Sequence, residues 1–372
     1  MNQLNSHAVF NNSSVLIEGW YWLMRSSELK RKQVKPFTFL GRELAIFRGE
    51  DGRVVAMDAY CPHMGAHLAE GRVEGNSIRC FFHYWKFSSQ GACEEIPCQP
   101  THDFVPAIKT YPCDEKYGLI WIWTGDKAIH PIPFVPEFKN TDIDSKLAGS
   151  FVKNCHPSVM MINAIDAQHF NSVHNIPVEL FLKPEPVNEN CINFNNQTRM
   201  PELSWWTRFA GRFYEGALTY NMSYWNASTG SVTVGPDFLH FHIIFALRPT
   251  LDGKSEGQTI LVTKKRTGLF GRSLNRVLLY LTEIVGNYFA KGDTLIFKTI
   301  KFNFQTPIKA DQAIISFIQH AEKQKISAWM RNEVQHGGRL EQTHGTVVEN
   351  SSNSPALARR QSANVRNPEQ VL

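Results

Sequence analysis

Two short pairs of cysteine and histidine constrain this chain more than any other feature of its sequence. The first pair is Cys61-x-His63, and the second pair, Cys80-x-x-His83, follows after sixteen intervening residues. Thiolates and imidazoles are common metal ligands, and two loops that each carry one Cys and one His can close around one metal centre. The chain around residues 61–83 must therefore fold so that two loops meet at their tips.

Mixed sulfur and nitrogen ligands allow two kinds of centre. One is a structural zinc ion bound by two Cys and two His. The other is a Rieske-type [2Fe–2S] cluster, in which two thiolates hold one iron and two imidazoles hold the other. Each pair here mixes the two residue types, which favours the cluster over a zinc finger. We expect Gly65 and Gly71 to let the first loop turn sharply, and the aromatic residues of 84–87 to shield the centre.

Residues 61–87 resemble the Rieske signature of ring-hydroxylating oxygenases, in particular the branch of ketosteroid hydroxylases and cholesterol desaturases. The likeness lies in CPHMGAHLAEGRV and in the later FFHYWKF. Two positions depart from that branch: Phe81 replaces a usual Pro and Tyr84 replaces a frequent Gly, and both can alter the cluster potential or the docking of an electron donor. The resemblance implies these cluster ligands: Cys61, His63, Cys80 and His83.

The other cysteines are expected to be free thiols. The chain has seven Cys, an odd number that excludes complete pairing and is far below that of a disulfide scaffold. A second metal site at Cys93 and Cys98 is not favoured. His67 is expected to hydrogen-bond within its loop or lie at the surface, although it is a possible further ligand.

A second constellation lies downstream, where His169 and His174 are five residues apart. On an ideal helix this spacing separates two side chains by about 140°, so one metal can bind both only if the helix breaks between them. Asn171-Ser172 is a poor helix-forming pair and supplies such a break. With a carboxylate from elsewhere, the two imidazoles would form the facial triad that suits non-haem Fe(II). Taken alone, two His at this spacing indicate an iron site only weakly, because surface or core histidines are commoner.

The resemblance extends to this segment residue by residue. The family's mononuclear iron motif has Asn or Asp, then Asp, then two His, and the positions that match are Asn163, Asp166, His169 and His174. On a regular helix Asp166 would share a face with His169, and its carboxylate could accept the ring N–H of that ligand. In the family this Asp also bridges subunits, which implies a homotrimer in which His63 or His83 of one chain approaches Asp166 of the next.

The third ligand is expected to be Asp293, because KGDTLIFKTIKF resembles the family's Asp followed by an apolar, aromatic and basic run. The alternative for Asp293 is a capping or turn residue after Gly292. Glu283 lies in an amphipathic stretch, where its alternative is a solvated helix face. The full set of carboxylates considered was Asp237, Asp252, Glu256, Glu283, Asp293 and Asp311.

The expected fold class is α+β. Short strands split by turns run to about residue 124, and helices mix with longer strands afterwards. We expect an antiparallel β Rieske domain at 16–126, a helix-grip-like catalytic domain at 127–345 and a disordered tail at 346–372. Expected helices are Val159 to Asn171, Leu274 to Ala290 and Ala310 to Arg331; expected strands are Leu218 to Trp225, Phe238 to Leu247 and Ile260 to Lys265. The first two of these strands could line a substrate pocket, or could simply be core.

Composition limits the partners. The net charge of +5 is diffuse, without a basic stripe, so nucleic-acid binding is not expected. Neither a secretory signal nor a spanning apolar segment is visible, and a cytoplasmic location is expected. Leu274 to Ala290 is read as an amphipathic core helix rather than a membrane-surface helix; peripheral membrane contact is possible but not indicated.

The resemblance implies a terminal oxygenase that uses O2 to hydroxylate or desaturate a hydrophobic ring-containing, isoprenoid or sterol-like substrate at mononuclear Fe(2+). Electrons would come from an external ferredoxin or NAD(P)H-dependent reductase, because the chain lacks a Gly-x-Gly-x-x-Gly nucleotide motif at a strand–helix junction. Two alternatives stay open. An electron-transfer Rieske protein would hold two irons per chain rather than three, and a zinc-binding structural module would be colourless.

Overall fold

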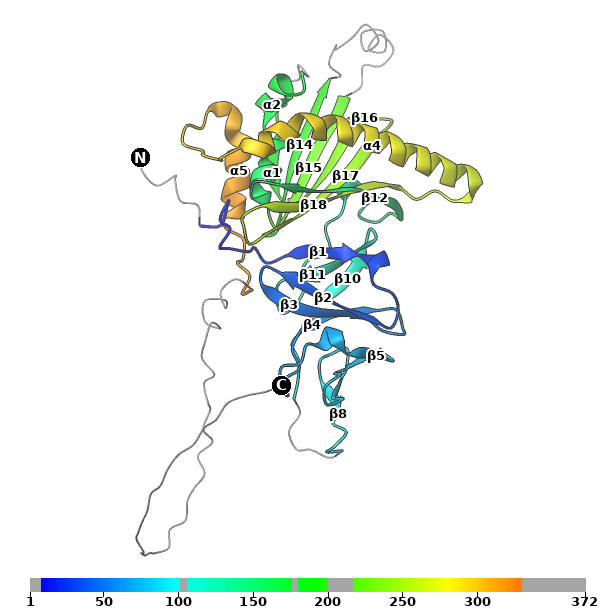
Figure 1. The fold of residues 1–372 in the computed structure, drawn as a ribbon. Coiled ribbons are helices and arrows are strands. Elements are labelled where there is room, and N and C mark those ends of the chain that lie inside the picture. The colour runs from blue at the N-terminus through cyan, green and yellow to red at the C-terminus, as the bar shows by residue number, and fades with distance from the viewer. Residues whose placement is uncertain (1–7, 101–105, 176–179, 200–216, 330–372) are drawn as a thin grey trace, which may run out of the picture. The chain divides into compact units, whose positions relative to one another are not determined.

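A computed structural model describes residues 8–100, 106–175, 180–199 and 217–329, all within one unit that spans residues 1–334. The expected tail at 346–372 lies outside the described residues. Strands fill the first part, and a large antiparallel sheet with helices follows, so the expected α+β class is confirmed (Figure 1).

Three small antiparallel sheets make up the first part, in the orders β1-β11-β10, β2-β3-β4-β9 and β5-β6-β7-β8. The strands are β1 (Trp20–Arg25), β2 (Gln33–Phe39), β3 (Arg42–Arg48), β4 (Val54–Asp58), β5 (Arg72–Glu74), β6 (Ser77–Arg79), β7 (Lys86–Phe87), β8 (Cys93–Glu95), β9 (Thr110–Tyr111), β10 (Cys113–Lys116) and β11 (Leu119–Trp123). A turn at Glu50-Asp51-Gly52 joins β3 to β4, with Gly52 at a φ of 89°.

Strand β11 links the first part to the second. Its five residues are all buried, because both of its faces are covered. Ile120 and Ile122 pack into a core with β1, β2 and β3, while Trp121 and Trp123 pack against apolar side chains of the large sheet, among them Ile244. This explains why the run Leu-Ile-Trp-Ile-Trp is apolar throughout rather than alternating.

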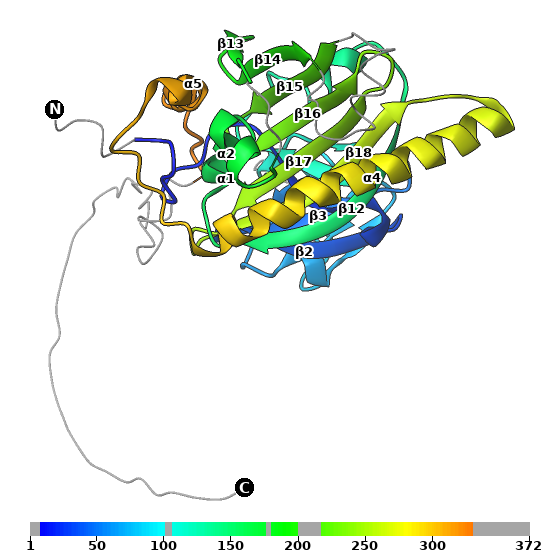
Figure 2. The same cartoon turned by 90° about the horizontal axis from the view of Figure 1, so that it is seen from above.

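The second part is built on a seven-stranded antiparallel sheet with the order β12-β18-β17-β16-β15-β14-β13. Its strands are β12 (Ile143–Lys153), β13 (Lys183–Pro186), β14 (Cys191–Arg199), β15 (Ala217–Trp225), β16 (Thr229–Pro236), β17 (Phe241–Pro249) and β18 (Ser255–Lys264). A turn at Asp252-Gly253 joins β17 to β18. Its helices are α1 (Pro157–Asn163), α2 (Ala167–Ser172), α4 (Gly268–Thr299) and α5 (Gln312–Ala321). Helix α4 lies across β12, β17 and β18, in the manner of a helix-grip fold (Figures 1 and 2).

The helix boundaries differ from those expected. The predicted helix at 159–171 is two helices, α1 and α2, separated at 164–166. The predicted helix at 274–290 is only the middle of α4, which has 32 residues. The part of the predicted helix at 310–331 that lies in the described residues, up to 329, is helical only in α5 and in the short 3-10 turn before it, at Lys309–Asp311. Among the described residues, no helix combines the length and apolar character needed to cross a membrane.

Candidate metal centres

The two cysteine–histidine pairs lie on neighbouring loops. Cys61 follows β4, and Cys80 comes directly after β6. The first loop is held by hydrogen bonds from Cys61 N to Ala66 O and from Gly65 N to Cys61 O, both 2.9 Å. The second is closed by Cys80 N donating to Trp85 O at 2.9 Å. Both loops therefore turn back on themselves within a few residues.

The thiols lie inside and the imidazoles outside. Cys61 and Cys80 are 4% and 2% exposed, whereas His63 and His83 are exposed with ring centroids 4.6 Å apart. Trp85 stacks on His63 at 4.4 Å with the rings nearly parallel, so the expected aromatic shielding applies to this His. The arrangement suits a cluster with one iron held by buried thiolates and the other near the surface.

Burial disfavours ionisation of the Cys61 thiol. Burial raises the pKa of the Cys61 thiol to about 11, and neighbouring Cys80 adds to the rise, while the backbone N–H groups of His63 and Met64 oppose it. A bound metal ion would reverse this preference, because coordination deprotonates a thiol outright. The geometry also disfavours a single zinc ion. A tetrahedral site with bonds of about 2.0–2.3 Å holds its ligand atoms within about 4 Å of one another, and no three of these four residues come within 4.8 Å in the described structure.

The two loop glycines act differently. Gly65 has a φ of 73°, which confirms its role in a tight turn. Gly71 has an ordinary backbone conformation, and its importance is space: a Cβ there would lie 2.2 Å from the carbonyl oxygen of Arg79. The chain does turn at Gly71, whose N–H donates to Leu68 O at 2.9 Å, but the turn does not depend on a left-handed φ there. Tyr84 has a φ of 59°, a conformation that favours glycine.

His67 is engaged within its own loop, since its Nδ1 accepts a hydrogen bond of 3.1 Å from Ala69 N. This agrees with the structural role expected for it. The other five cysteines are free thiols: Cys93, Cys98, Cys113, Cys155 and Cys191.

A second centre forms where α2, the turn after it and α4 meet. Here Nε2 of His174 lies 3.1 Å from Oδ1 of Asp293, and Nε2 of His169 lies 3.8 Å from the same oxygen. Among the described residues, these three form the one group of possible metal ligands with atoms within 4.8 Å of one another. Both the His174 nitrogen and the Asp293 oxygen are buried without a hydrogen bond, a costly state that a bound cation would relieve. The donor set fits a 2-His-1-carboxylate iron site.

The geometry around His169 corrects the prediction for Asp166. Asp166 is the N-cap of α2, where its side chain accepts a hydrogen bond from Gln168 N. Its backbone carbonyl, and not its carboxylate, accepts the Nδ1–H of His169 at 2.6 Å. Helix α2 ends at Ser172, which confirms the break predicted at Asn171-Ser172 and leaves His174 beyond the helix. A second break, before Asp166, separates α1 from α2, so Asp166 and His169 do not share a helical face as predicted. The carbonyl still fixes the tautomer and leaves Nε2 of His169 free for a metal.

Asn163, the last residue of α1, completes this corner, with its Nδ2 3.4 Å from His169 Nε2. The Tyr220 hydroxyl donates to Ala164 O at 2.8 Å and anchors the break between α1 and α2. Burial raises the pKa of Tyr220, and the negative charge of Asp293 adds to the rise. For His174 burial has the opposite sign: it lowers the pKa of the imidazole, while the negative charge of Asp293 acts to raise it. The imidazole is thus kept in the neutral form that binds metal.

Asp293 lies inside α4, not at a turn. Helix α4 continues through Gly292. A glycine at this position leaves room for the ring of His174, because a Cβ there would lie 2.9 Å from Cε1 of the ring. The capping alternative for Asp293 is therefore wrong. Glu283, on the same helix, is ion-paired with Lys146 at 2.7 Å rather than solvated. Most of the other carboxylates have partners away from the centre: Asp252 with Lys254, Glu256 with Arg248, and Asp311 with Gln168.

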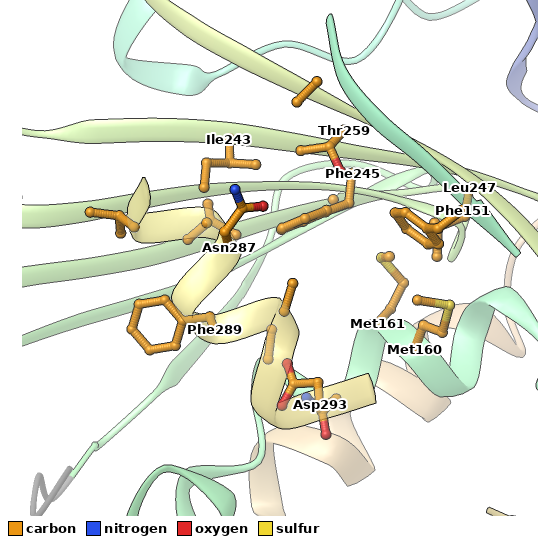
Figure 3. A pocket seen from close by; sticks show the side chains of 18 of the residues that line it. Phe151, Met160, Met161, Ile243, Phe245, Leu247, Thr259, Asn287, Phe289 and Asp293 are labelled. Atoms are coloured by element: carbon orange, nitrogen blue, oxygen red, sulfur yellow. The ribbon is translucent and has the colours of Figure 1, made fainter. Parts of the chain in front are cut away.

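A cavity of about 320 Å³ opens from this centre between α4, α1 and the large sheet (Figure 3). Both of the predicted pocket strands contribute to its wall, β15 through Met222 and β17 through Phe245. Most of the wall is apolar, with Asn287 and Thr259 among the few polar side chains. Such a shape is typical of small-molecule sites.

Known proteins resemble the chain in sequence over its first part and in fold over most of its length. The family profile described as the Rieske [2Fe-2S] domain matches residues 19–112. The chain contains a Rieske domain. Aminopyrrolnitrin oxygenase from Pseudomonas fluorescens is 35% identical over 184 residues, which cover 46% of this chain and 50% of that protein. Cholesterol 7-desaturase from Bombyx mori is 36% identical over 161 residues, which cover 42% of this chain and 35% of that protein. The resemblance to the Rieske oxygenases is thereby confirmed, although the chain spans half or less of the length of these two relatives.

Beyond the Rieske domain the likeness is one of fold. The terminal oxygenase of carbazole 1,9a-dioxygenase from Novosphingobium has a TM-score of 0.63 at 18% identity, over 84% of this chain and 94% of that one. The Rieske domain and the sheet-rich part after it are thus arranged as in a solved oxygenase component.

Several site residues were missed by the sequence analysis. Asn287, Phe289 and Gly292 all reach the cavity or the centre from α4. Spacing from Asp293 could have indicated Phe289, which lies four positions before it and so on the same helix face. Asn287 and Gly292, six and one positions away, carry no such signal. Phe151 and Met160, from β12 and α1, carry no such signal.

Proposed function

We propose that the chain is a terminal oxygenase in which a Rieske cluster supplies electrons to a mononuclear iron centre. The observation that carries this proposal is the group formed by His169, His174 and Asp293 at the mouth of an apolar cavity. Three protein ligands on one side leave other positions open to O2 and face the space where a substrate would lie. We divide the chain near residue 126, with electron storage before it and oxygen chemistry after it.

The proposed cluster ligands are Cys61, His63, Cys80 and His83, and the proposed iron ligands are His169, His174 and Asp293. Ferrous iron at such a site supplies O2 activation, with the second electron delivered by the cluster. The side chains around it have simpler tasks. The Asp166 carbonyl orients His169, Gly292 admits the ring of His174, and the apolar wall excludes water and holds the substrate.

Electrons must enter from outside, through a ferredoxin or an NAD(P)H-dependent reductase. The exposed imidazoles of His63 and His83 lie beside exposed apolar side chains, among them Met64, which suits transient docking of such a donor. We infer a homotrimer in which one of these imidazoles approaches Asp166 of the next chain. In support, Asp166 is partly exposed, and only one of its carboxylate oxygens is used in capping α2.

The proposed substrate is a hydrophobic molecule with rings or an isoprenoid or sterol-like skeleton, which is hydroxylated or desaturated. The apolar cavity supports this class, and the relatives named above include a cholesterol desaturase and an aminopyrrolnitrin oxygenase. Product type depends on which carbon lies nearest the iron, so the same ligands serve more than one outcome.

Turnover with 18O2 tests the proposal. The protein, loaded with iron and supplied with a ferredoxin and reductase, is incubated with sterols, carotenoids and aromatic compounds. Incorporation of 18O, or desaturation coupled to O2 uptake, is the expected result for at least one compound. His169→Ala should abolish it while the visible spectrum of the Rieske cluster stays unchanged. An electron-transfer protein without oxygenase chemistry would give no product and no difference between the two proteins.

A further inference from the structure

Helix α4 has two faces with different surroundings. Gly286, Phe289 and Asp293 line the cavity, and Leu279 is buried against the sheet. The opposite side of the helix carries exposed apolar side chains, which we call the outer face of α4: Leu269, Phe270, Val277, Tyr280, Ile284 and Tyr288. At roughly 100° per residue, these six lie within a sector of about 100°. An apolar stripe this continuous is unusual on a solvent-exposed helix.

The exposure is greatest at the start of the helix. Leu269 and Phe270 are 85% and 84% exposed, and the first turns of α4 extend past the edge of the strands (Figures 1 and 2). A free energy of roughly 1.5–3 kcal/mol per side chain opposes leaving such residues in water.

The charged side chains that the first turns of α4 and the segment before them contribute are all basic, while β12 brings one acidic side chain, Asp144, which accepts a hydrogen bond from Asn275. Between Lys264 and Thr282 the chain has no acidic residue. It has five basic ones: Lys264, Lys265, Arg266, Arg272 and Arg276. Within the described structure none of the five forms an ion pair, and four of them are exposed. Apolar side chains flanked by unpaired basic ones match the interface of an anionic bilayer, where basic side chains meet lipid phosphates.

We propose that the outer face of α4 docks on an anionic lipid bilayer, with Leu269 and Phe270 inserted below the headgroups. A two-fold contact between two such faces is disfavoured, because it would bring the exposed basic side chains of both copies together. The trimer contact inferred above uses the Rieske imidazoles and Asp166, and not the outer face of α4. Docking would place the helix that walls the cavity at the lipid surface, where hydrophobic molecules dissolve. This last consequence rests on the proposed function, whereas the docking itself does not.

Vesicle co-sedimentation of the full-length, cluster-loaded protein tests the inference. Two kinds of vesicle are compared: phosphatidylcholine alone, and an equal mixture of phosphatidylcholine and phosphatidylglycerol. We expect binding to the mixed vesicles, weak binding to phosphatidylcholine, and release by high salt because basic–phosphate attraction is screened.

Two double variants address the two parts of the surface. Leu269→Ser with Phe270→Ser should lower the partition coefficient about a hundredfold, since each buried side chain favours transfer by at least roughly tenfold. Arg272→Glu with Arg276→Glu should lower it at least about thirtyfold on mixed vesicles. All four positions are exposed, so folding should persist, as the Rieske spectrum would report. Leu251→Ser is the matched control, at a 62% exposed site in the turn at the far end of β18.

Three results would overturn the inference: no binding of the wild-type protein, equal binding of wild type and the Leu269/Phe270 variant, or an equal loss in Leu251→Ser. A change of mass in solution in the Leu269/Phe270 variant would show instead that a second copy covers this face, and would overturn it as well. Vesicle binding is measured without turnover. A failure to bind vesicles would therefore leave the oxygenase proposal intact, and a failure to turn over substrate would leave the vesicle-binding result interpretable.

Discussion

Gly292 controls how closely α4 approaches His174. A Cβ at this position would lie 2.9 Å from Cε1 and 3.0 Å from Nδ1 of the ring. Carbon atoms in contact are normally about 3.5–4.0 Å apart, so Gly292→Ala must move the ring or the helix by roughly 0.6 Å or more. The ring has little room, because the His174 side chain is 2% exposed and packs 5.1 Å from Phe289.

Such a shift is large for a metal site, where ligands must be held within about 0.5 Å. We expect Gly292→Ala to weaken Fe(II) binding about 10- to 100-fold, the range found when the support of a ligand is lost. Competition with a ferrous-iron chelator measures the affinity, and the visible spectrum of the cluster serves as a check on the Rieske domain.

Gly286→Ala is the matched control on the same helix. Its Cβ would meet only Cδ1 of Ile243, at 3.0 Å, which is the flexible end of a side chain. Both substitutions raise helix propensity by about 0.5–1 kcal/mol, so this effect cancels in the comparison. Equal iron affinity in the two variants would refute the argument that Gly292 positions His174.

Other substitutions test separate parts of the structure. Gly71→Ala should prevent cluster incorporation, measured by visible absorbance, because its Cβ would lie 2.2 Å from Arg79 O; Gly149→Ala, which meets nothing within 4 Å and has no left-handed φ, should retain the cluster. Asp166→Asn should slow electron transfer from cluster to iron in stopped flow yet keep the iron, since the backbone carbonyl holds His169; lost iron would contradict this. Tyr220→Phe should lower the free energy of unfolding by about 1–3 kcal/mol, because Ala164 O loses its buried donor; unchanged denaturant midpoints would count against it.

The sequence allowed the Rieske domain and its cluster type to be predicted, while the four ligands stay a prediction. A Rieske cluster requires Cys and His ligands, and the residues that shape its loops, such as Gly65, lie beside these ligands in the sequence. The whole pattern is therefore contained in one short segment. The strands were predicted well for a similar reason, because turns such as Asp252-Gly253 are local.

The second centre was predicted less completely because its geometry depends on packing between distant segments. Helix α4 continues through Gly286 and Gly292, and at both positions a neighbouring side chain lies where a Cβ would be. Asp166 was placed inside a helix, although an Asp before an apolar-periodic segment is also a helix-start signal. The role of its backbone carbonyl could not be read from residue type.

Iron content tests the central claim most directly, because the claim is that one chain holds two separate iron centres. Metal analysis together with electron paramagnetic resonance of the reduced protein should give three irons per chain, two in the cluster and one outside it. Asp293→Ala should remove one iron and leave the cluster signal intact. A wild-type protein with two irons per chain, or an Asp293→Ala variant that still holds three, would contradict the account.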